Sequence, residues 1–203
     1  MNLNTLKAAP HAKGLIFDLD GTLADTMPVH YKACQDVCVP RGFDFPLNFF
    51  FDMAGIPTIP CFAELVSKYH LDADAEELAK LKEERFLELI DLIKPIYPVA
   101  DIVRQNKGLM PMSIGTGGER VSVDKTLRAI NFIDTFPIRV CSEDVKKHKP
   151  DPETFLKCAH MMKVHPKDCQ VFEDGELGLT AAREAGMIAT DVRPYLPEFK
   201  TIN

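Results

Sequence analysis

The chain has 203 residues, 46% of them hydrophobic, and a formal net charge of −6 at pH 7. No lysine or arginine cluster gives nucleic-acid binding an electrostatic basis, and no apolar stretch reaches membrane-spanning length. The N-terminus lacks the apolar segment of a signal peptide, and the six cysteines, without a C-x-x-C pair, are typical of reduced thiols, so we expect a cytoplasmic protein. We also expect a monomer with no nucleic-acid or membrane partner.

The first predicted element is a strand over residues 14–19, whose apolar run is typical of a central parallel strand buried on both faces. Asp18 and Asp20 end this strand with a spacing that places both carboxylates on one side of an extended backbone. Two anions this close repel each other, and a magnesium ion bound to their oxygens would relieve the repulsion. Gly21 would then allow a sharp turn. The alternative is that these residues only end a strand and begin a turn.

A long stretch without a convincing strand follows. Helical periodicity marks residues 28–39, 59–70 and 75–93, and Pro95 and Pro98 mark the exit from this segment. A crossover between two strands needs only one helix, so the excess predicts an inserted helical cap domain at residues 25–95, acting as a lid on a site at the sheet end. The remaining residues, 1–24 and 96–203, would form the core domain.

Two basic residues stand out in the expected helix 75–93. Its apolar residues occupy one broad arc, and Lys82 and Arg85 fall inside that arc. One interpretation is that their alkyl stems pack against apolar neighbours while the charged groups reach water. The other is that one of the two cations contacts an anionic substrate. The sequence leaves both interpretations open.

Strand-like runs recur in the second half of the chain and alternate with helical patterns. The strands are expected at residues 111–115, 138–141, 170–173 and 187–192, and the helices at 119–130, 152–162 and 176–185. This alternation predicts an α/β fold, a Rossmann-like doubly wound parallel sheet with right-handed crossovers. Such sheets bind ligands beyond the carboxyl ends of their strands, which makes the polar residues at those ends the candidate site.

Four stretches, each at a strand end or just before a helix, carry a family resemblance. They are residues 18–22 (DLDGT), 113–118 (SIGTGG), 149–155 (KPDPETF) and 172–175 (FEDG), the last followed by Gly178 and residues 181–186 (AAREAG). In this order they resemble the haloacid dehalogenase-like hydrolase superfamily over nearly the whole chain. The helical insertion is similar to the small four-helix cap of the β-phosphoglucomutase-like group. Residues 115–192 are most similar to the bacterial fructose-1-phosphate and 6-phosphogluconate phosphatases of that group.

Chemical roles for these residues follow from the needs of phosphoryl transfer, which are a nucleophile, an acid–base group and donors to the phosphoryl oxygens. Asp18 is the candidate nucleophile, forming an aspartyl-phosphate, and Asp20 is the candidate acid and base. Thr116 would donate its hydroxyl and Lys149 its charge to the phosphate, with Gly117 also in the substrate site. The alternatives are a plain strand-end threonine for Thr116 and a solvated basic loop for Lys149.

Acidic residues also provide a candidate magnesium site. Asp18 and Asp174 would bind the ion through their carboxylates, and the resemblance adds the backbone carbonyl of Asp20. Glu173 is expected to orient ligands or waters rather than to bind the ion. Alternatively, either Glu173 or Asp174 is the N-cap of the helix that follows.

The resemblance also extends to three positions in the helical insertion. His30 matches a position used near the acid–base group, although a lone helical histidine is more often structural or exposed. Lys82 matches a lysine that contacts the substrate in the mutases. The loop at residues 55–58 matches one in which a mutase carries a phosphate-binding arginine, but this chain has Thr58 there.

Together the resemblance implies a magnesium-dependent phosphatase that hydrolyses a small sugar phosphate, such as fructose-1-phosphate or 6-phosphogluconate, through an aspartyl-phosphate. A β-phosphoglucomutase-type phosphohexomutase is the alternative, which Thr58 disfavours. A dehalogenase would leave Asp20 and Asp174 without a purpose. A binding protein that had lost its chemistry would not be expected to keep all four stretches.

Overall fold

The computed structural model describes residues 6–53 and 56–202, which form two compact units. The sheet unit contains residues 6–25 and 93–198, and the helical unit contains residues 26–53, 56–92 and 199–202. The helical unit differs from the predicted cap, residues 25–95, in beginning at residue 26, in leaving the sheet unit to resume at residue 93 and in including residues 199–202. Gly55, in the loop compared with the mutases, lies outside the described residues.

A five-stranded parallel sheet with the order β3-β2-β1-β4-β5 forms the centre of the sheet unit. Phe17, at the end of the central strand β1, is in register with Ile114 of β2 and with Phe172 of β4. The predicted α/β fold with a parallel sheet is therefore confirmed. The strands are β1 (Gly14–Phe17), β2 (Met112–Gly115), β3 (Ile138–Val140), β4 (Cys169–Glu173) and β5 (Ile188–Asp191).

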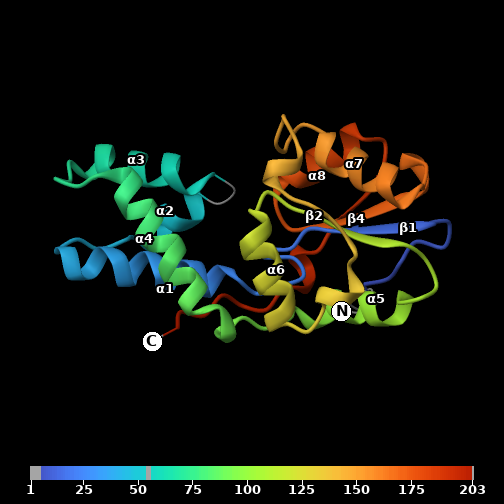
Figure 1. Cartoon of the computed structure of the whole chain (residues 1–203), viewed down its shortest axis with the longest axis horizontal. Coiled ribbons are helices and arrows are strands. Elements are labelled where there is room, and N and C mark those ends of the chain that lie inside the picture. Colours follow the sequence, from blue (N-terminus) through green and yellow to red (C-terminus); the bar gives the residue numbers. More distant parts are fainter. Residues whose placement is uncertain (1–5, 54–55, 203) are drawn as a thin grey trace. The chain divides into compact units, whose positions relative to one another are not determined.

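Helices cover both faces of the sheet. Figure 1 shows α5 (Tyr97–Asn106) and α6 (Arg120–Ala129) on one face, with α7 (Glu153–Met162) and α8 (Glu176–Glu184) on the other. The chain moves outward from β1 to β3 and then returns to β4 and β5, so right-handed crossovers place the two pairs of helices on opposite faces. All four residues of β1 are buried, as expected for a strand covered on both sides.

Close packing fixes the strand ends in place. Ile16 of β1 belongs to one hydrophobic cluster with Phe155 of α7 and Ala182 of α8. Phe17 stacks on Phe172 of β4, with ring centroids 4.9 Å apart and nearly parallel planes. Since β2, β1 and β4 are neighbours, the residues that follow them meet at one edge of the sheet.

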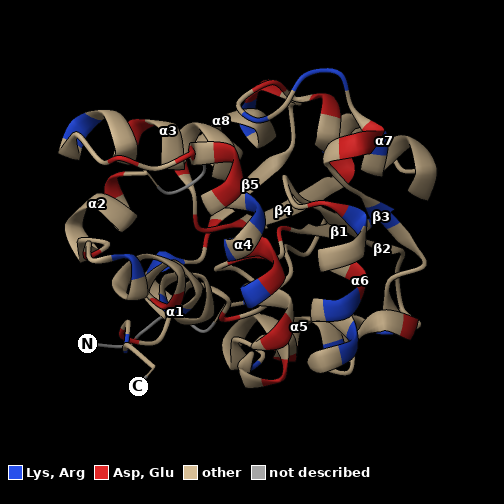
Figure 2. Ribbon diagram, turned by 60° about the vertical axis from the view of Figure 1, so that its left-hand side comes forward, with Lys and Arg blue, Asp and Glu red and all other residues tan. Residues whose placement is uncertain are grey.

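The helical unit has an aromatic core. Phe45 makes edge contacts with Phe49 and Phe62, at centroid distances of 5.5 and 5.6 Å. Asp74 caps the fourth helix by accepting hydrogen bonds from two backbone N–H groups of its first turn. Figure 2 shows that this helix, α4, carries both basic and acidic residues. The helices of the unit are α1 (Met27–Cys38), α2 (Leu47–Asp52), α3 (Thr58–Tyr69) and α4 (Ala75–Glu88).

Two helices were not expected from the sequence, α2 and α5. Pro98, which with Pro95 was predicted to mark the exit from the inserted segment, lies in the first turn of α5, where a proline removes no intrahelical hydrogen bond. The expected helix 75–93 is divided, because α4 ends at Glu88 and a 3₁₀ turn follows. No helix within residues 6–53 and 56–202 is long and apolar enough to cross a membrane. The 3₁₀ turns are Val39–Arg41, Ile90–Leu92, Ile133–Thr135, Ser142–Asp144, Pro166–Asp168 and Arg193–Tyr195.

Candidate active site

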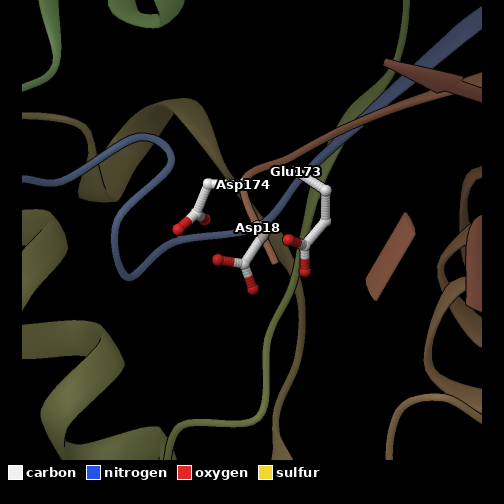
Figure 3. A group of neighbouring side chains, drawn as sticks. All are labelled: Asp18, Glu173 and Asp174. Carbon is white, nitrogen blue, oxygen red and sulfur yellow. The ribbon is translucent and has the colours of Figure 1, made fainter. Parts of the chain in front are cut away.

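Three carboxylates meet at the carboxyl edge of β1 and β4. Asp18 directly follows β1, Glu173 ends β4, and Asp174 follows it. One oxygen from each lies within 4.8 Å of the others, and Figure 3 shows the three side chains gathered at this edge. The backbone N–H of Asp18 donates to the carbonyl of Phe172 at 3.0 Å, so the sheet ladder continues up to the site. The topology thus brings together residues that are far apart in the sequence.

Lys149 lies among these acids. Its Nζ donates to Asp18 Oδ1 and to Glu173 Oε1, both at 2.7 Å, and its side chain is only 12% exposed. The ammonium also lies 4.8 Å from the ring centroid of Phe155. A freely solvated loop lysine would have none of these contacts. The geometry therefore favours the predicted role of Lys149 as the positive charge of the site over the alternative of a solvated loop.

The site holds more negative than positive charge. Burial raises the pKa of Asp18 well above its usual range, and Glu173, Asp174 and Asp20 raise it further, while Lys149 opposes the shift. Burial likewise raises the pKa of Asp174 to about 6, although a hydrogen bond from Thr22 opposes this. A bound cation would relieve this crowding of acids.

The pKa of Lys149 is also raised. Burial alone would lower it, but the charges of Asp18 and Glu173 and their hydrogen bonds to Lys149 outweigh that effect. Lys149 therefore stays protonated at neutral pH, with its charge shared between two carboxylates.

Hard oxygen ligands of this kind fit a magnesium ion. Lys149 uses Asp18 Oδ1, and Thr22 donates to Asp174 Oδ1 at 2.5 Å, so each of these two carboxylates has its other oxygen to offer. Gly21, at φ +81°, brings the backbone against Asp174, where an added Cβ would lie 2.5 Å from Oδ2. Asp18 and Asp174 are therefore suited to hold the ion, as the sequence predicts.

Glu173 is occupied on both oxygens. Oε1 accepts from Lys149, and Oε2 accepts from the backbone N–H of Gly175 at 2.6 Å. The N-cap residue of α8 is Gly175, and it makes no side-chain cap, so neither Glu173 nor Asp174 is the N-cap residue of that helix. The residue that Glu173 contacts through its side chain is thus Lys149, and the expectation that Glu173 orients ligands or waters stays a prediction.

Gly178 of α8 leaves the space that the Glu173 carboxylate needs. A Cβ at position 178 would overlap that carboxylate. We therefore expect Gly178→Ala to displace Glu173 from Lys149 and to lower kcat about tenfold or more, the loss expected for a misplaced charged group. Alanine is the better helix former by about 1 kcal/mol, so the protein should still fold. Turnover and thermal unfolding measure the two effects.

Leu177→Ala, at an exposed position one residue earlier, is the matched control and should leave kcat unchanged. Wild-type turnover in the Gly178→Ala variant would contradict the role of this glycine.

Thr116, Asp20 and the glycines beyond β2 lie together. Thr116 is buried, and its Oγ1 accepts a hydrogen bond from the backbone N–H of Gly118 at 3.0 Å, which leaves the hydroxyl proton to donate. A Cβ on Gly118 would lie 3.4 Å from Asp20 Oδ2 and 3.5 Å from Thr116 Oγ1, so both groups border this loop. A Cβ on Gly117 would meet no described atom within 4 Å, which leaves its backbone accessible.

The side chain of Asp20 is not part of the acidic cluster found among the described residues. The spacing in the sequence suggested a magnesium ion between the carboxylates of Asp18 and Asp20, but the cluster contains only the first of these. The resemblance assigns the backbone carbonyl of Asp20 to the ion, and that assignment stays a prediction. The Asp20 carboxylate borders the Gly118 loop, as Thr116 does, and its charge contributes to the raised pKa of Asp18.

The residues singled out in the helical insertion also come together, within the helical unit. Lys82 is buried, and its Nζ lies 2.9 Å from Nδ1 of His30. Thr58 Oγ1 donates to Glu83 Oε1 at 2.5 Å, and Lys82 donates to the same oxygen at 2.9 Å. Sequence reasoning missed Glu83, because nothing in the pattern links it to a threonine 25 positions earlier.

Arg85 behaves differently from Lys82. It pairs with Asp36 at 2.8 Å and with Glu88 at 2.7 Å, and its side chain is 36% exposed. Of the two cations inside the apolar arc, Lys82 is the buried one. The interpretation of an alkyl stem with a solvated charge therefore fits Arg85 and not Lys82.

Known proteins match the chain over most of its length. A model of the family described as haloacid dehalogenase-like hydrolase matches residues 15–192. Fructose-1-phosphate phosphatase YqaB from Escherichia coli (strain K12) is 39% identical over 181 residues, which cover 89% of this chain and 96% of that protein. β-Phosphoglucomutase from Bacillus subtilis (strain 168) is 31% identical over 191 residues, which cover 89% and 83%.

A solved structure has the same fold. CbbY from Rhodobacter sphaeroides, in complex with phosphate, matches with a TM-score of 0.77 at 21% identity, covering 93% of this chain and 90% of that one. At this identity the likeness concerns the fold alone. The family match, in contrast, spans all four sequence stretches. The chain therefore belongs to the haloacid dehalogenase-like hydrolase family of enzymes and, within it, to the β-phosphoglucomutase-like group.

Proposed function

We propose that this hydrolase is a magnesium-dependent phosphatase that acts on a small sugar phosphate through an aspartyl-phosphate. The observation that carries the proposal is the setting of Asp18, a buried carboxylate held by Lys149 at a strand end and adjoining Asp174. The name of the relative from Escherichia coli supports a sugar phosphate as the substrate, with fructose-1-phosphate as the first candidate. 6-Phosphogluconate is the second candidate.

In the first step, a carboxylate oxygen of Asp18 attacks phosphorus while the bond to the sugar oxygen breaks. Asp20 donates a proton to that leaving oxygen. Lys149 and the Thr116 hydroxyl donate to the phosphoryl oxygens, and the backbone at Gly117 faces the same group. A bound magnesium ion would supply further positive charge to these oxygens.

In the second step, Asp20, now a carboxylate, removes a proton from water. The water oxygen attacks phosphorus, and the bond to Asp18 breaks, which releases inorganic phosphate and restores the free carboxylate. Glu173 keeps Lys149 in place throughout. Thus each acid of the site has a different task, set by its contacts.

The helical unit would provide selectivity for the sugar. We assign His30 and Lys82 to contacts with the part of the substrate that leaves. The mutase alternative requires a grip on a second phosphate, for which the bidentate fork of an arginine is suited. Thr58 provides one hydroxyl, which already donates to Glu83. This observation favours a phosphatase.

We expect inorganic phosphate to be released from a hexose or sugar-acid monophosphate without accumulation of an isomeric phosphate. The test follows β-glucose-1-phosphate by phosphorus NMR, with magnesium and a catalytic amount of glucose-1,6-bisphosphate present. Fructose-1-phosphate and 6-phosphogluconate are assayed in parallel for phosphate release. Conversion to glucose-6-phosphate faster than phosphate release would establish the mutase instead.

A further inference from the structure

Four polar side chains of the helical unit, His30, Thr58, Lys82 and Glu83, form what we call the Glu83 cluster. Glu83 Oε1 accepts from the Thr58 hydroxyl at 2.5 Å and from the Lys82 ammonium at 2.9 Å. Lys82 also contacts Nδ1 of His30 at 2.9 Å. The His30 ring stacks on Phe86, with centroids 4.0 Å apart and an interplanar angle of 5°. The Glu83 carboxylate thus binds two donors, Thr58 and Lys82, that could otherwise donate to a ligand.

Opposite charges meet within the cluster. Burial alone would raise the pKa of Glu83, but the Lys82 charge and the hydrogen bond from Thr58 outweigh it and lower the pKa, so Glu83 is ionised at neutral pH. An ammonium has only hydrogens to donate, so Nδ1 of His30 accepts from Lys82. The Lys82 cation therefore lies directly beside the Glu83 anion.

We infer that Glu83 determines substrate specificity by rejecting a second negative group and accepting an uncharged polyol. This inference rests on the proposed function, in which the helical unit contacts the leaving part of the substrate. Lys82 alone, buried at 7% side-chain exposure, would attract a phosphate or a carboxylate. An anion that approached Lys82 would be repelled by the Glu83 carboxylate, which already accepts a hydrogen bond from the same nitrogen.

A neutral hydroxyl meets no such repulsion. It can accept from Lys82 and donate to Glu83, whose side chain is 41% exposed. The preferred substrates are therefore monophosphates of uncharged sugars. Sugar bisphosphates and phosphorylated sugar acids are disfavoured, which places fructose-1-phosphate ahead of 6-phosphogluconate.

The variant Glu83→Gln tests the charge while keeping an oxygen that accepts from Thr58 and Lys82. The measurement is kcat/KM for fructose-1-phosphate, fructose-1,6-bisphosphate and 6-phosphogluconate. We expect the ratio of each charged substrate to fructose-1-phosphate to rise at least about tenfold, as removal of one close like charge allows. In the wild type, high salt should reduce the discrimination, because ions screen a partly exposed charge.

Glu84→Gln is the matched control. Glu84 is the next residue on α4, its side chain is 58% exposed, and it contacts Lys80 at 4.0 Å. The same change of charge there should leave all three ratios at their wild-type values. Unchanged ratios in Glu83→Gln, or equal changes in both variants, would overturn the inference.

A binding experiment separates this inference from the proposed function. Titration calorimetry on the Asp18→Asn protein, with and without Glu83→Gln, compares the Kd values of fructose-1-phosphate and fructose-1,6-bisphosphate in the presence of magnesium. If the wild type hydrolyses no phosphate ester, the proposed function fails, and the binding ratio still decides the role of Glu83. Turnover with unchanged ratios refutes the role of Glu83 alone.

Discussion

Replacing Asp18 by asparagine should abolish turnover and leave the fold intact. An amide lacks the anionic oxygen that must bond to phosphorus, and Glu173, which also binds Lys149, has both of its oxygens occupied. We expect kcat to fall at least about a thousandfold, or ~4 kcal/mol of barrier. Phosphate release by purified protein measures this, and retention of more than about a hundredth of wild-type kcat would contradict the nucleophile assignment.

Asp134→Asn provides the control for that substitution. Asp134 lies on the same unit, in an exposed 3₁₀ turn, and the change removes the same charge. Its kcat should equal that of the wild type. A loss in both variants would indicate a general effect of net charge rather than the loss of a nucleophile.

The difference in stability between the Asp18→Asn protein and the wild type should depend on pH. Burial and the neighbouring acids raise the pKa of Asp18 in the folded state, so its protonation stabilises the fold at pH values below its unfolded-state pKa. That stabilisation is lost as the pH rises through the raised pKa. Without metal, the variant should therefore unfold at a higher temperature than the wild type at pH 8, and the gap should narrow on acidification.

Much of the site could be predicted because sequence and topology agree there. Asp18, Thr116 and Asp174 each follow a strand, and neighbouring parallel strands bring such residues to one edge. Lys149 lies in a loop between β3 and α7, so only the resemblance predicted its place. The pattern of acids and glycines gave no reason for Gly178, since the close approach of Glu173 to a helix backbone exists only in three dimensions.

The helical unit was harder to predict. Periodicity located three of its helices, but the cluster around Glu83 joins α3 and α4 through polar side chains, which have no periodic pattern. Phe199 falls within residues 96–203, which were predicted to belong to the core domain. It packs on Phe51 and Tyr31 of the helical unit, with centroids 4.9 and 6.1 Å apart. Long-range aromatic contacts of this kind leave no local signal.

Removing divalent cations should abolish turnover as completely as the loss of Asp18. The acids of the site outnumber Lys149, and a phosphate group would bring still more negative charge to them. We expect no phosphate release after exhaustive chelation and full recovery when magnesium is added. Calcium should bind but support little turnover, because its larger and looser coordination misplaces the reacting groups. Undiminished hydrolysis by the chelated enzyme would refute the metal site.

Binding of the metal can be followed without turnover, through its effect on stability. Magnesium should raise the unfolding temperature of the wild type, since a ligand that binds only the folded state stabilises it. The effect should be lost in Asp174→Asn but kept in Asp134→Asn. Protons compete for the same oxygen, because burial raises the pKa of Asp174 to about 6. The affinity for magnesium should therefore weaken as the pH falls through about 6, and an affinity that stays constant from pH 8 to pH 5 would remove Asp174 from the ligand set.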